Sequence, residues 1–257
     1  MPEPVSLYII AYNEAKNLRE VLPTVLWADE VLVADSFSTD DTVEICRSFG
    51  VRHVNLKFEG FGKLRNEAVA LLKNDWVVSI DSDERSTPEF AAEVRRTLAE
   101  PPPFDAYHVP RKSHFLGKWM RHSGWYPDYR QPQVFNRKKM RYRGDLVHEG
   151  YQLDGRLGHL REHVLQYPWP TLEVATAKLQ RYSTLMADRY RAGNKRASLP
   201  SLMGSPFAMF LRIYILKSGW RDGRHGLILA TLYAYYTFLK YAKLWERQLK
   251  HVETLKR

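Results

Sequence analysis

The chain has 257 residues, of which 44% are hydrophobic and 26% are charged, and this composition excludes a disordered, collagen-like or disulfide-stapled protein. Its one cysteine, Cys46, cannot form an internal disulfide and is expected to be a buried, reduced thiol. The formal net charge of +10 favours an anionic partner, such as nucleic acid, anionic lipid or a phosphorylated substrate, without choosing among them.

The first hundred residues alternate short apolar runs with segments of helical spacing. Strands are expected at Val5–Ile10, Val31–Ala34, Val51–Leu56 and Trp76–Ile80. Helices are expected over about residues 18–25, 43–49 and 64–72, and from Thr87-Pro88 onward, with Thr87 as the N-cap and Pro88 as the first helical residue. This alternation predicts an α/β fold with a mostly parallel sheet flanked by helices.

The pattern changes after Pro101-Pro102-Pro103. Short strands joined by long loops are expected at Ala106–Val109, Gln133–Phe135 and Tyr151–Leu160. A helix is expected from Thr171 to about Arg191, then a polar linker over Ala192–Leu199 and a helical segment over Pro206–Arg257. We therefore expect a sheet domain over residues 1–165 and a C-terminal helical extension over residues 166–257.

The C-terminal segment combines an uncharged run with a basic stripe. Gly226–Leu239 contains no charged residue, but fourteen residues cannot span a hydrocarbon core of about 30 Å. Basic side chains then recur at helical spacing, at Lys240, Lys243, Arg247 and Lys250. This combination is typical of a helix lying in an anionic membrane interface. The alternative is a helix packed on the rest of the protein, with its basic face in water.

Asp81-Ser82-Asp83 directly follows the strand at Trp76–Ile80, which is apolar on both faces as a buried parallel strand is. Ligands of open α/β sheets bind at the carboxyl ends of the strands. Two carboxylates on alternate residues can offer oxygen ligands to Mg²⁺ or Mn²⁺ and a contact to a ribose. Such a pair also occurs in solvated acidic turns, and its position after the strand favours the binding site.

Two further polar turns follow the first and second strands, at Ala11-Tyr12-Asn13-Glu14 and Asp35-Ser36-Phe37-Ser38-Thr39-Asp40. All three turns should therefore meet at one edge of the sheet. A carboxylate there can accept the imide N–H of a uracil, and backbone amides at helix starts favour phosphate. Each turn could also serve only as a helix N-cap.

These residues resemble the motifs of family 2 glycosyltransferases, which have the GT-A fold. Ala11–Glu14 is similar to the family's "TYNE", Val31–Asp40 to its "VVDSGSTD" turn, Asp81–Asp83 to its Asp-x-Asp, and Gly60–Asn66 to its "GxGxxRN" stretch. Within the family, the chain most resembles lipopolysaccharide core glycosyltransferases of the WaaE/KdtX type. That likeness rests on residues 27–30, 58–62, 124–128, 147–149 and 241–246.

The resemblance implies an inverting transfer from a nucleotide sugar, usually UDP-linked, with Mg²⁺ or Mn²⁺ as the cofactor. The implied donor-binding residues are Ala11, Tyr12, Glu14, Asp35, Lys63, Arg65, Asp81 and Ser82. Asp83 would ligate the metal, with Asp81 and His148 as further candidate ligands; His148 could equally be hydrogen-bonded beside the site. Two departures are Phe37, where the family usually has Gly, and Ala11, where it has Thr or Pro.

Inversion by single displacement needs a base that takes the proton of the acceptor hydroxyl. The resemblance places this acid after the strand at Gln133–Asn136, which makes Glu149 the first candidate and Asp128 the second. The loop Pro110–Arg130 is rich in aromatic and basic residues, which suit a phosphorylated sugar acceptor, although such a loop can also simply cover the sheet. The acceptor-binding candidates are Arg111, Trp125, Tyr126 and Arg130.

The function expected from the sequence is transfer of a sugar, glucose by the subgroup's pattern, from a UDP-sugar to an inner-core lipopolysaccharide or similar glycolipid on the cytoplasmic face of a bacterial inner membrane. An alternative within the same class is an enzyme that builds another cell-surface polysaccharide. A basic nucleic-acid-binding module would leave the three acidic turns unexplained, and a nucleotidyltransferase would usually have a Gly-rich first turn, whereas Val5–Glu14 has no glycine. A non-catalytic scaffold would require the loss of Asp83 or of the base.

Overall fold

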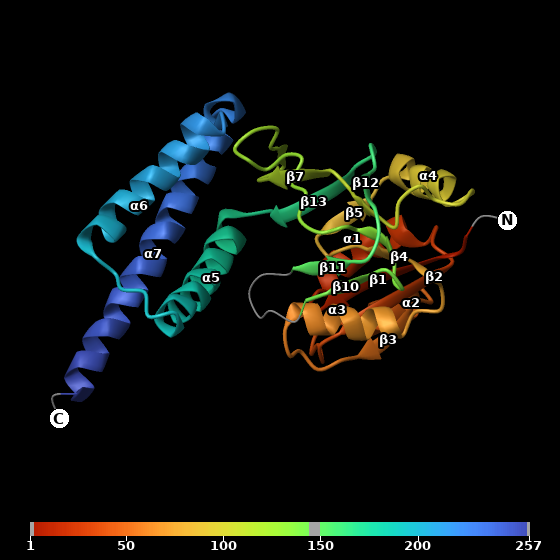
Figure 1. Ribbon diagram of the computed structural model, residues 1–257, viewed down its shortest axis with the longest axis horizontal. Coiled ribbons are helices and arrows are strands. Elements are labelled where there is room, and N and C mark those ends of the chain that lie inside the picture. Colours follow the sequence, from red (N-terminus) through yellow and green to blue (C-terminus); the bar gives the residue numbers. More distant parts are fainter. Residues whose placement is uncertain (1–2, 144–149, 256–257) are drawn as a thin grey trace. The chain divides into compact units, whose positions relative to one another are not determined.

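The computed structural model describes residues 3–143 and 150–255, with side chains to residue 249. The chain divides into two compact units, each described here by itself (Figure 1). The first unit comprises Met1–Lys112 and Pro127–Gln166, and the second comprises Ser113–Tyr126 and Tyr167–Arg257. The chain passes between them within two strands, β7 (Arg111–Phe115) and β13 (Val164–Trp169), and once in the loop near residue 126.

The first unit is built on a seven-stranded sheet in the order β12-β6-β9-β4-β1-β2-β3. Its strands are β1 (Val5–Ala11), β2 (Glu30–Asp35), β3 (Arg52–Asn55), β4 (Trp76–Ser79), β6 (Ala106–His108), β9 (Val134–Asn136) and β12 (Leu157–His159). β1 pairs in parallel with both β2 and β4, and β2 pairs in parallel with β3. β9 runs antiparallel to both β4 and β6. The sheet is therefore mostly parallel, as the alternating sequence pattern predicts.

Side-chain alternation along β1 assigns the helices to the two faces of this sheet. The helices are α1 (Ala15–Val25), α2 (Thr42–Ser48), α3 (Phe61–Ala70) and α4 (Pro88–Thr97). Leu7 and Ile9 join a core cluster with side chains of α1, α2 and α4, whereas Tyr8, between them, joins a second cluster with Ala68 and Val69 of α3. Figure 1 shows α3 on the opposite side of the sheet from α1. Both faces are buried, which explains the continuous apolar runs of these strands.

The sequence pattern misses several short strands. β5 (Glu84–Ser86) pairs antiparallel with β13, and β10 (Met140–Tyr142) pairs with β11 (Tyr151–Leu153). The single strand expected at Tyr151–Leu160 is wrong, because β11 and β12 are separate strands in different sheets. Gly155 makes the break: its φ is +157°, and a Cβ there would lie 2.4 Å from the Asp105 carboxylate.

The second unit contains the hairpin of β7 and β8 (Lys118–Trp119) and a set of helices. These are α5 (Leu172–Ala192), α6 (Leu199–Leu211), a π-helical turn (Arg212–Leu216), a 3₁₀ turn (Gly219–Asp222) and α7 (Arg224–Leu255). α7 packs against both α5 and α6 (Figure 1). The helix expected from Pro206 begins earlier, because Ser198 forms a capping box with Ser201, and Pro206 lies inside α6.

The basic stripe of α7 faces α5. Lys243 donates to the Gln180 carbonyl at 2.9 Å and to the Ser183 hydroxyl at 2.8 Å. Arg247 forms an ion pair with Asp188 at 3.0 Å. Lys240 lies over the rings of three tyrosines, Tyr190, Tyr236 and Tyr241. Three of the four cations expected to meet lipid therefore have partners inside the second unit; the fourth, Lys250, lies outside the described side chains.

Candidate active site

The carboxyl ends of β1, β2 and β4 lie at one edge of the sheet. Ala11, the last residue of β1, is paired in register with Asp35, the last residue of β2, and Tyr8 is paired with Ser79, which ends β4. The polar turns after these strands therefore meet there, as predicted. Ala11 is buried and offers its carbonyl oxygen to the Ser36 amide at 2.9 Å.

The first two turns are tied together by hydrogen bonds between them. The Asn13 amide donates to Ser38 Oγ at 2.7 Å, and the Thr39 amide donates to Asn13 Oδ1 at 2.8 Å. Asn13 and Phe37 both have left-handed backbones, with φ values of +54° and +61°. Asparagine tolerates this region, but a bulky residue rarely adopts it, so the turn keeps the conformation that glycine would adopt freely.

Two aromatic side chains at these turns stand out from the surface: Tyr12 is 58% exposed and Phe37 is 59% exposed. Glu14, at the start of α1, accepts a hydrogen bond from Asn17 Nδ2 at 2.6 Å. Asp35 is fully buried, and its carboxylate accepts the Ser38 amide at 3.0 Å and lies 3.4 Å from His53 Nε2. The Asp35 carboxylate thus stabilises the turn to which it belongs.

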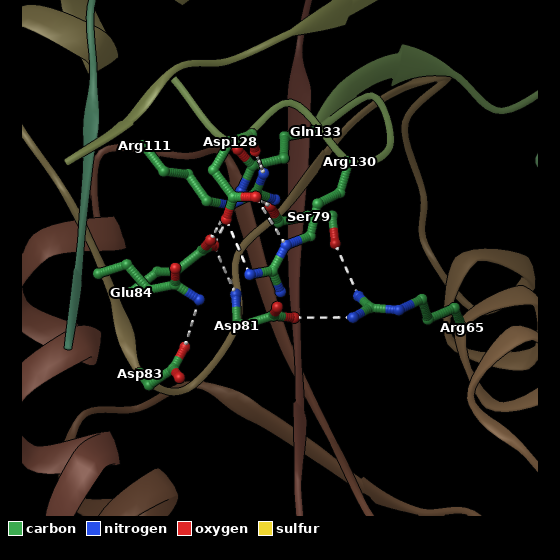
Figure 2. Close-up of polar contacts among 10 residues, drawn as sticks. Arg65, Ser79, Asp81, Asp83, Glu84, Arg111, Asp128, Arg130 and Gln133 are labelled. Carbon is green, nitrogen blue, oxygen red and sulfur yellow. Dashed lines mark hydrogen bonds and ion pairs between the residues drawn. The ribbon is translucent and has the colours of Figure 1, made fainter. Parts of the chain in front are cut away.

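The third turn is organised by Arg65, a buried residue of α3 (Figure 2). Arg65 Nη2 forms an ion pair with Asp81 Oδ1 at 2.8 Å, and its Nη1 donates to Ser79 Oγ at 3.0 Å. Arg65 also lies against the Tyr142 ring, 5.6 Å from the ring centroid. Two of the predicted donor-binding residues, 16 positions apart in the sequence, are therefore in direct contact.

Glu84 and Gln133 belong to the same cluster but were not predicted (Figure 2). Glu84 is fully buried and pairs with Arg111 Nε at 2.6 Å through one carboxylate oxygen. Its other oxygen accepts the Asp81 amide at 3.0 Å and Gln133 Nε2 at 2.8 Å. The signal available in the sequence was a third acid directly after Asp81-Ser82-Asp83, in a segment that leaves a buried strand. Arg111, which was predicted to bind the acceptor, forms an ion pair with this buried carboxylate.

Opposing effects set the charge of this cluster. Burial works to raise the pKa of Asp81, but the charges of Arg65, Arg111 and Arg130 outweigh it and hold this pKa below its usual value. For Glu84, burial dominates over Arg111, and the neighbouring charges of Asp81 and Asp83 act in the same direction as burial; together they raise its pKa to about 7. Asp81 is therefore anionic at neutral pH.

Asp83 extends from the same turn, and Gln166 Nε2 lies 3.4 Å from its Oδ1 (Figure 2). Asp81 and Asp83 supply two hard carboxylates, the ligand type that Mg²⁺ and Mn²⁺ take in small number alongside substrate phosphates. Their chemistry therefore fits such an ion. Within residues 3–143 and 150–249, no group of three or more His, Cys, Asp or Glu side chains is placed to hold a metal. Both His148 and Glu149 lie outside the described residues.

Asp128, the second candidate base, is described, and its φ is +50°. Its carboxylate forms an ion pair with Arg130, with Oδ2 2.8 Å from Nη2 and Oδ1 3.2 Å from Nε. Its carbonyl oxygen accepts a bond from Arg111 Nη1 at 2.9 Å. Burial lowers the pKa of Arg130 and is the largest single effect. The charges of Asp128, Asp81 and Glu84 act in the opposite direction, and together they raise this pKa. Arg130 is thus a fixed cation beside Asp81.

The remaining predicted residues lie at the rim of the cluster or in the second unit. Lys63 is half exposed and pairs with Glu59 and Glu67 on α3 and the turn before it. The Ser82 carbonyl accepts a bond from Arg85 Nη1 at 2.9 Å. Trp125 and Tyr126 belong to the second unit, where Trp125 Nε1 donates to the Tyr233 hydroxyl at 3.1 Å and Tyr126 packs edge-on against Trp119.

The chain is similar to named glycosyltransferases over nearly its whole length. The chain is 29% identical to the lipopolysaccharide core biosynthesis glycosyltransferase LpsC of Rhizobium meliloti, over 95% of this chain and 93% of that protein. It is 25% identical to an uncharacterized glycosyltransferase of Rickettsia felis, over 99% of this chain and 94% of the relative.

Among solved structures, a mannosyltransferase of Pyrobaculum calidifontis, PcManGT, aligns with a TM-score of 0.54 at 15% identity, over 96% of this chain and 88% of that one. TarS of S. aureus aligns with a TM-score of 0.50 at 15% identity, over 96% and 92% of the two chains. These likenesses confirm the GT-A glycosyltransferase fold. The sequence profile described as "Glycosyl transferase family 2" matches residues 6–152, which carry all three polar turns. The chain belongs to glycosyl transferase family 2 and is a glycosyltransferase.

Proposed function

We propose that this enzyme is an inverting, divalent-metal-dependent transferase that moves a sugar, glucose by our expectation, from a UDP-sugar to an inner-core lipopolysaccharide or similar glycolipid. The observation that carries the proposal is the pair of carboxylates Asp81 and Asp83 at the carboxyl end of β4, with Asp81 held in place by Arg65. Because carboxylates repel phosphate unless a metal intervenes, this pair suits a metal-bound nucleoside diphosphate better than a nucleic acid.

The relatives support the class of donor and acceptor. PcManGT was solved with GDP-Man and Mn²⁺, and TarS was solved with UDP-GlcNAc. LpsC is named for lipopolysaccharide core biosynthesis. From these we infer a nucleotide-sugar donor with a divalent metal, and an acceptor built on lipopolysaccharide core. An enzyme for another cell-surface polysaccharide is the second candidate, because PcManGT has the same fold and is named a mannosyltransferase, with no mention of lipopolysaccharide.

Each of the three turns has its own proposed role in binding the donor. Asp83 and Asp81 would hold Mg²⁺ or Mn²⁺, which neutralises charge on the departing diphosphate when bound. Tyr12 and Phe37 are both exposed at the strand ends and are our candidates to cover the nucleobase, with Asp35 and Glu14 as its proposed polar contacts. Arg65 fixes the Asp81 carboxylate and so sets the position of that ligand.

For the acceptor, we propose a base, a set of contacts and a region that meets the membrane. We place Glu149 as the base that takes the proton from the acceptor hydroxyl, with Asp128 second. The proposed acceptor contacts are Arg111, Trp125, Tyr126 and Arg130. Because the acceptor is a glycolipid, we place residues 1–165 as the catalytic domain and residues 166–257 as a region that meets the inner face of a bacterial inner membrane peripherally.

The test is a thermal-shift panel of nucleotides and nucleotide sugars with and without Mn²⁺, applied to the wild type and to Asp83→Ala. A ligand that binds the folded state raises its melting temperature. We expect a Mn²⁺-dependent rise with UDP or a UDP-sugar that Asp83→Ala abolishes while its unliganded melting temperature stays within a few degrees. Asp154→Ala, a change at an exposed aspartate outside the cluster, is the matched control and should keep the rise. An undiminished rise in Asp83→Ala would remove the proposed metal ligand.

A further inference from the structure

Helix α6 and the π-helical turn after it present an apolar face that the second unit leaves uncovered. Leu199, Met203 and Phe207 are 74%, 66% and 65% exposed, and none of the residues of α6 is buried. Leu211, Ile215 and Leu216 continue the same face and are exposed too. The four-residue spacing places these side chains along one side of the helix. Large exposed apolar patches mark sites of association with a membrane or another protein.

The opposite side of α6 is fixed to the folded unit at both ends. Near its start, Leu202 packs on a cluster of Ala187, Tyr241 and Leu244, from α5 and α7. Just beyond its end, the Lys217 carbonyl accepts the Ser123 amide at 2.8 Å. The stretch Leu199–Leu216 is long and apolar enough to cross a membrane, with a mean hydropathy of 1.4. Both ends of the helix are anchored on the same folded unit, which favours a helix that lies along the surface of that unit.

Charge identifies what covers this face. From Arg189 to Arg221 the chain carries seven Lys or Arg residues and no Asp or Glu. None of these seven lies between Leu199 and Leu211, so the cations flank the apolar stretch on both sides. One of them, Lys195, lies over the Tyr190 and Tyr241 rings, which leaves six to meet phosphate. At the C-terminal end, Arg221 lines a shallow pocket with Lys118 and Arg121, and the exposed Trp220 stands beside them.

The acid in that pocket, Asp222, can offset only one of these three positive charges. Asp222 is 2% exposed, and its carboxylate accepts the Ser123 hydroxyl at 2.8 Å and the His122 amide at 3.2 Å. An apolar stripe flanked by cations, with a tryptophan at one end, matches the layers of a membrane interface: acyl chains, then anionic phosphates, with Trp at the boundary.

We propose that α6, and not the basic stripe of α7, is the membrane-binding element, lying in the plane of an anionic bilayer with the Leu199–Leu216 face among the acyl chains and the flanking cations on the head-group phosphates. The inference rests on the proposed role at a membrane-borne acceptor and deepens it. Lys243 and Arg247 of α7 are already bonded to α5 and so are not the cations that meet lipid.

The first experiment is co-sedimentation of the full-length chain with vesicles of phosphatidylethanolamine and phosphatidylglycerol. Met203→Glu/Phe207→Glu puts two charges on the exposed face, and we expect its apparent affinity for the vesicles to fall by at least about tenfold. Tyr182→Glu/Leu185→Glu makes the same change in charge on the exposed surface of α5 and should bind as the wild type does. Circular dichroism should show both variants folded, because all four positions are exposed.

Three outcomes overturn the proposal. The first is a wild-type chain that does not sediment with the anionic vesicles, and the second is an α6 variant that sediments as well as the wild type does. The third is a wild-type dimer, seen by sedimentation velocity, that the α6 variant converts to monomer, since the face would then be covered by a second copy. Stabilisation by UDP and Mn²⁺ is measured on the same variants; its retention separates a failure at α6 from a failure of the donor site.

A fluorescent label measures insertion directly. Phe207→Cys carries an environment-sensitive fluorophore, and Leu185→Cys carries it on α5 as the control. The native Cys46 does not compete, because it is fully buried and its pKa is raised to about 11, by burial first and by Asp35 second. A blue shift at position 207 on anionic vesicles, with none at position 185, supports the proposal. Water-like emission at position 207 on a vesicle-bound protein overturns it.

Discussion

Three carboxylates of the site are each paired with an arginine. Arg65 holds Asp81, Arg111 holds the buried Glu84, and Arg130 holds Asp128 through both carboxylate oxygens. A two-point ion pair fixes the position of the carboxylate that it holds. Glu149 remains our first candidate for the base, and Asp128 the second.

At the residue scale, we expect Glu149→Gln to bind donor normally and to lose about 10²–10⁴-fold in turnover, the usual contribution of a general base. Asp128→Asn keeps the shape of its side chain but weakens the pair with Arg130, and should cost turnover less. Steady-state transfer rates and thermal shifts with UDP and Mn²⁺ check both. If Asp128→Asn shows the larger loss and Glu149→Gln keeps near-wild-type turnover, the roles are exchanged.

At the scale of elements, Thr87 at the start of α4 makes two hydrogen bonds, one local in sequence and one that depends on tertiary structure. Thr87 is the N-cap of this helix, accepting the Phe90 amide at 3.1 Å, and its hydroxyl also donates to the His163 carbonyl at 3.0 Å. The first bond is local and can be predicted from Thr87-Pro88. The second joins the start of α4 to the segment before β13, 76 residues away.

Thr87→Ala should therefore cost about 1–2 kcal/mol in the free energy of unfolding, toward the upper part of the range for an N-cap, since it loses both bonds. Thr87→Ser keeps the hydroxyl and should recover most of that loss. Urea unfolding of the two variants measures the difference. Equal stability of Thr87→Ala and the wild type would show that neither bond contributes.

At the scale of the whole molecule, the two units have separate tasks in our proposal: the first unit binds the donor, and the second presents α6 to lipid. All three polar turns belong to the first unit, and the whole apolar face of α6 belongs to the second. The residues that would bind the donor and the residues that would bind the membrane therefore lie in different units of the chain.

Hydrogen exchange should separate these tasks. With UDP and Mn²⁺, we expect slower exchange at the turns after β1, β2 and β4, and unchanged exchange in α5, α6 and α7, because ligand binding suppresses opening of the segments that hold it. Asp83→Ala should abolish the effect. Protection that arises instead in α6 or α7 would place the donor in the second unit and contradict the assignment.

The sequence by itself determined the alternation of β1–α1 through α4, the N-cap at Thr87, and the three polar turns at one sheet edge. Those features depend on local periodicity, on capping chemistry and on the rule that parallel strands end together, so neighbours in the chain suffice. The sequence also carried the family motifs, and with them the fold and the class of enzyme.

Tertiary structure alone decided which charges meet. The pairs Arg65–Asp81 and Arg111–Glu84 join residues 16 and 27 positions apart, and Lys243 and Arg247 turn toward α5 rather than toward lipid. Periodicity tells which side of a helix is apolar or basic, but not what packs against that side. For the same reason the exposed face of α6 came from the structure, because only the packing of α7 against its other side shows which apolar residues are left for a partner.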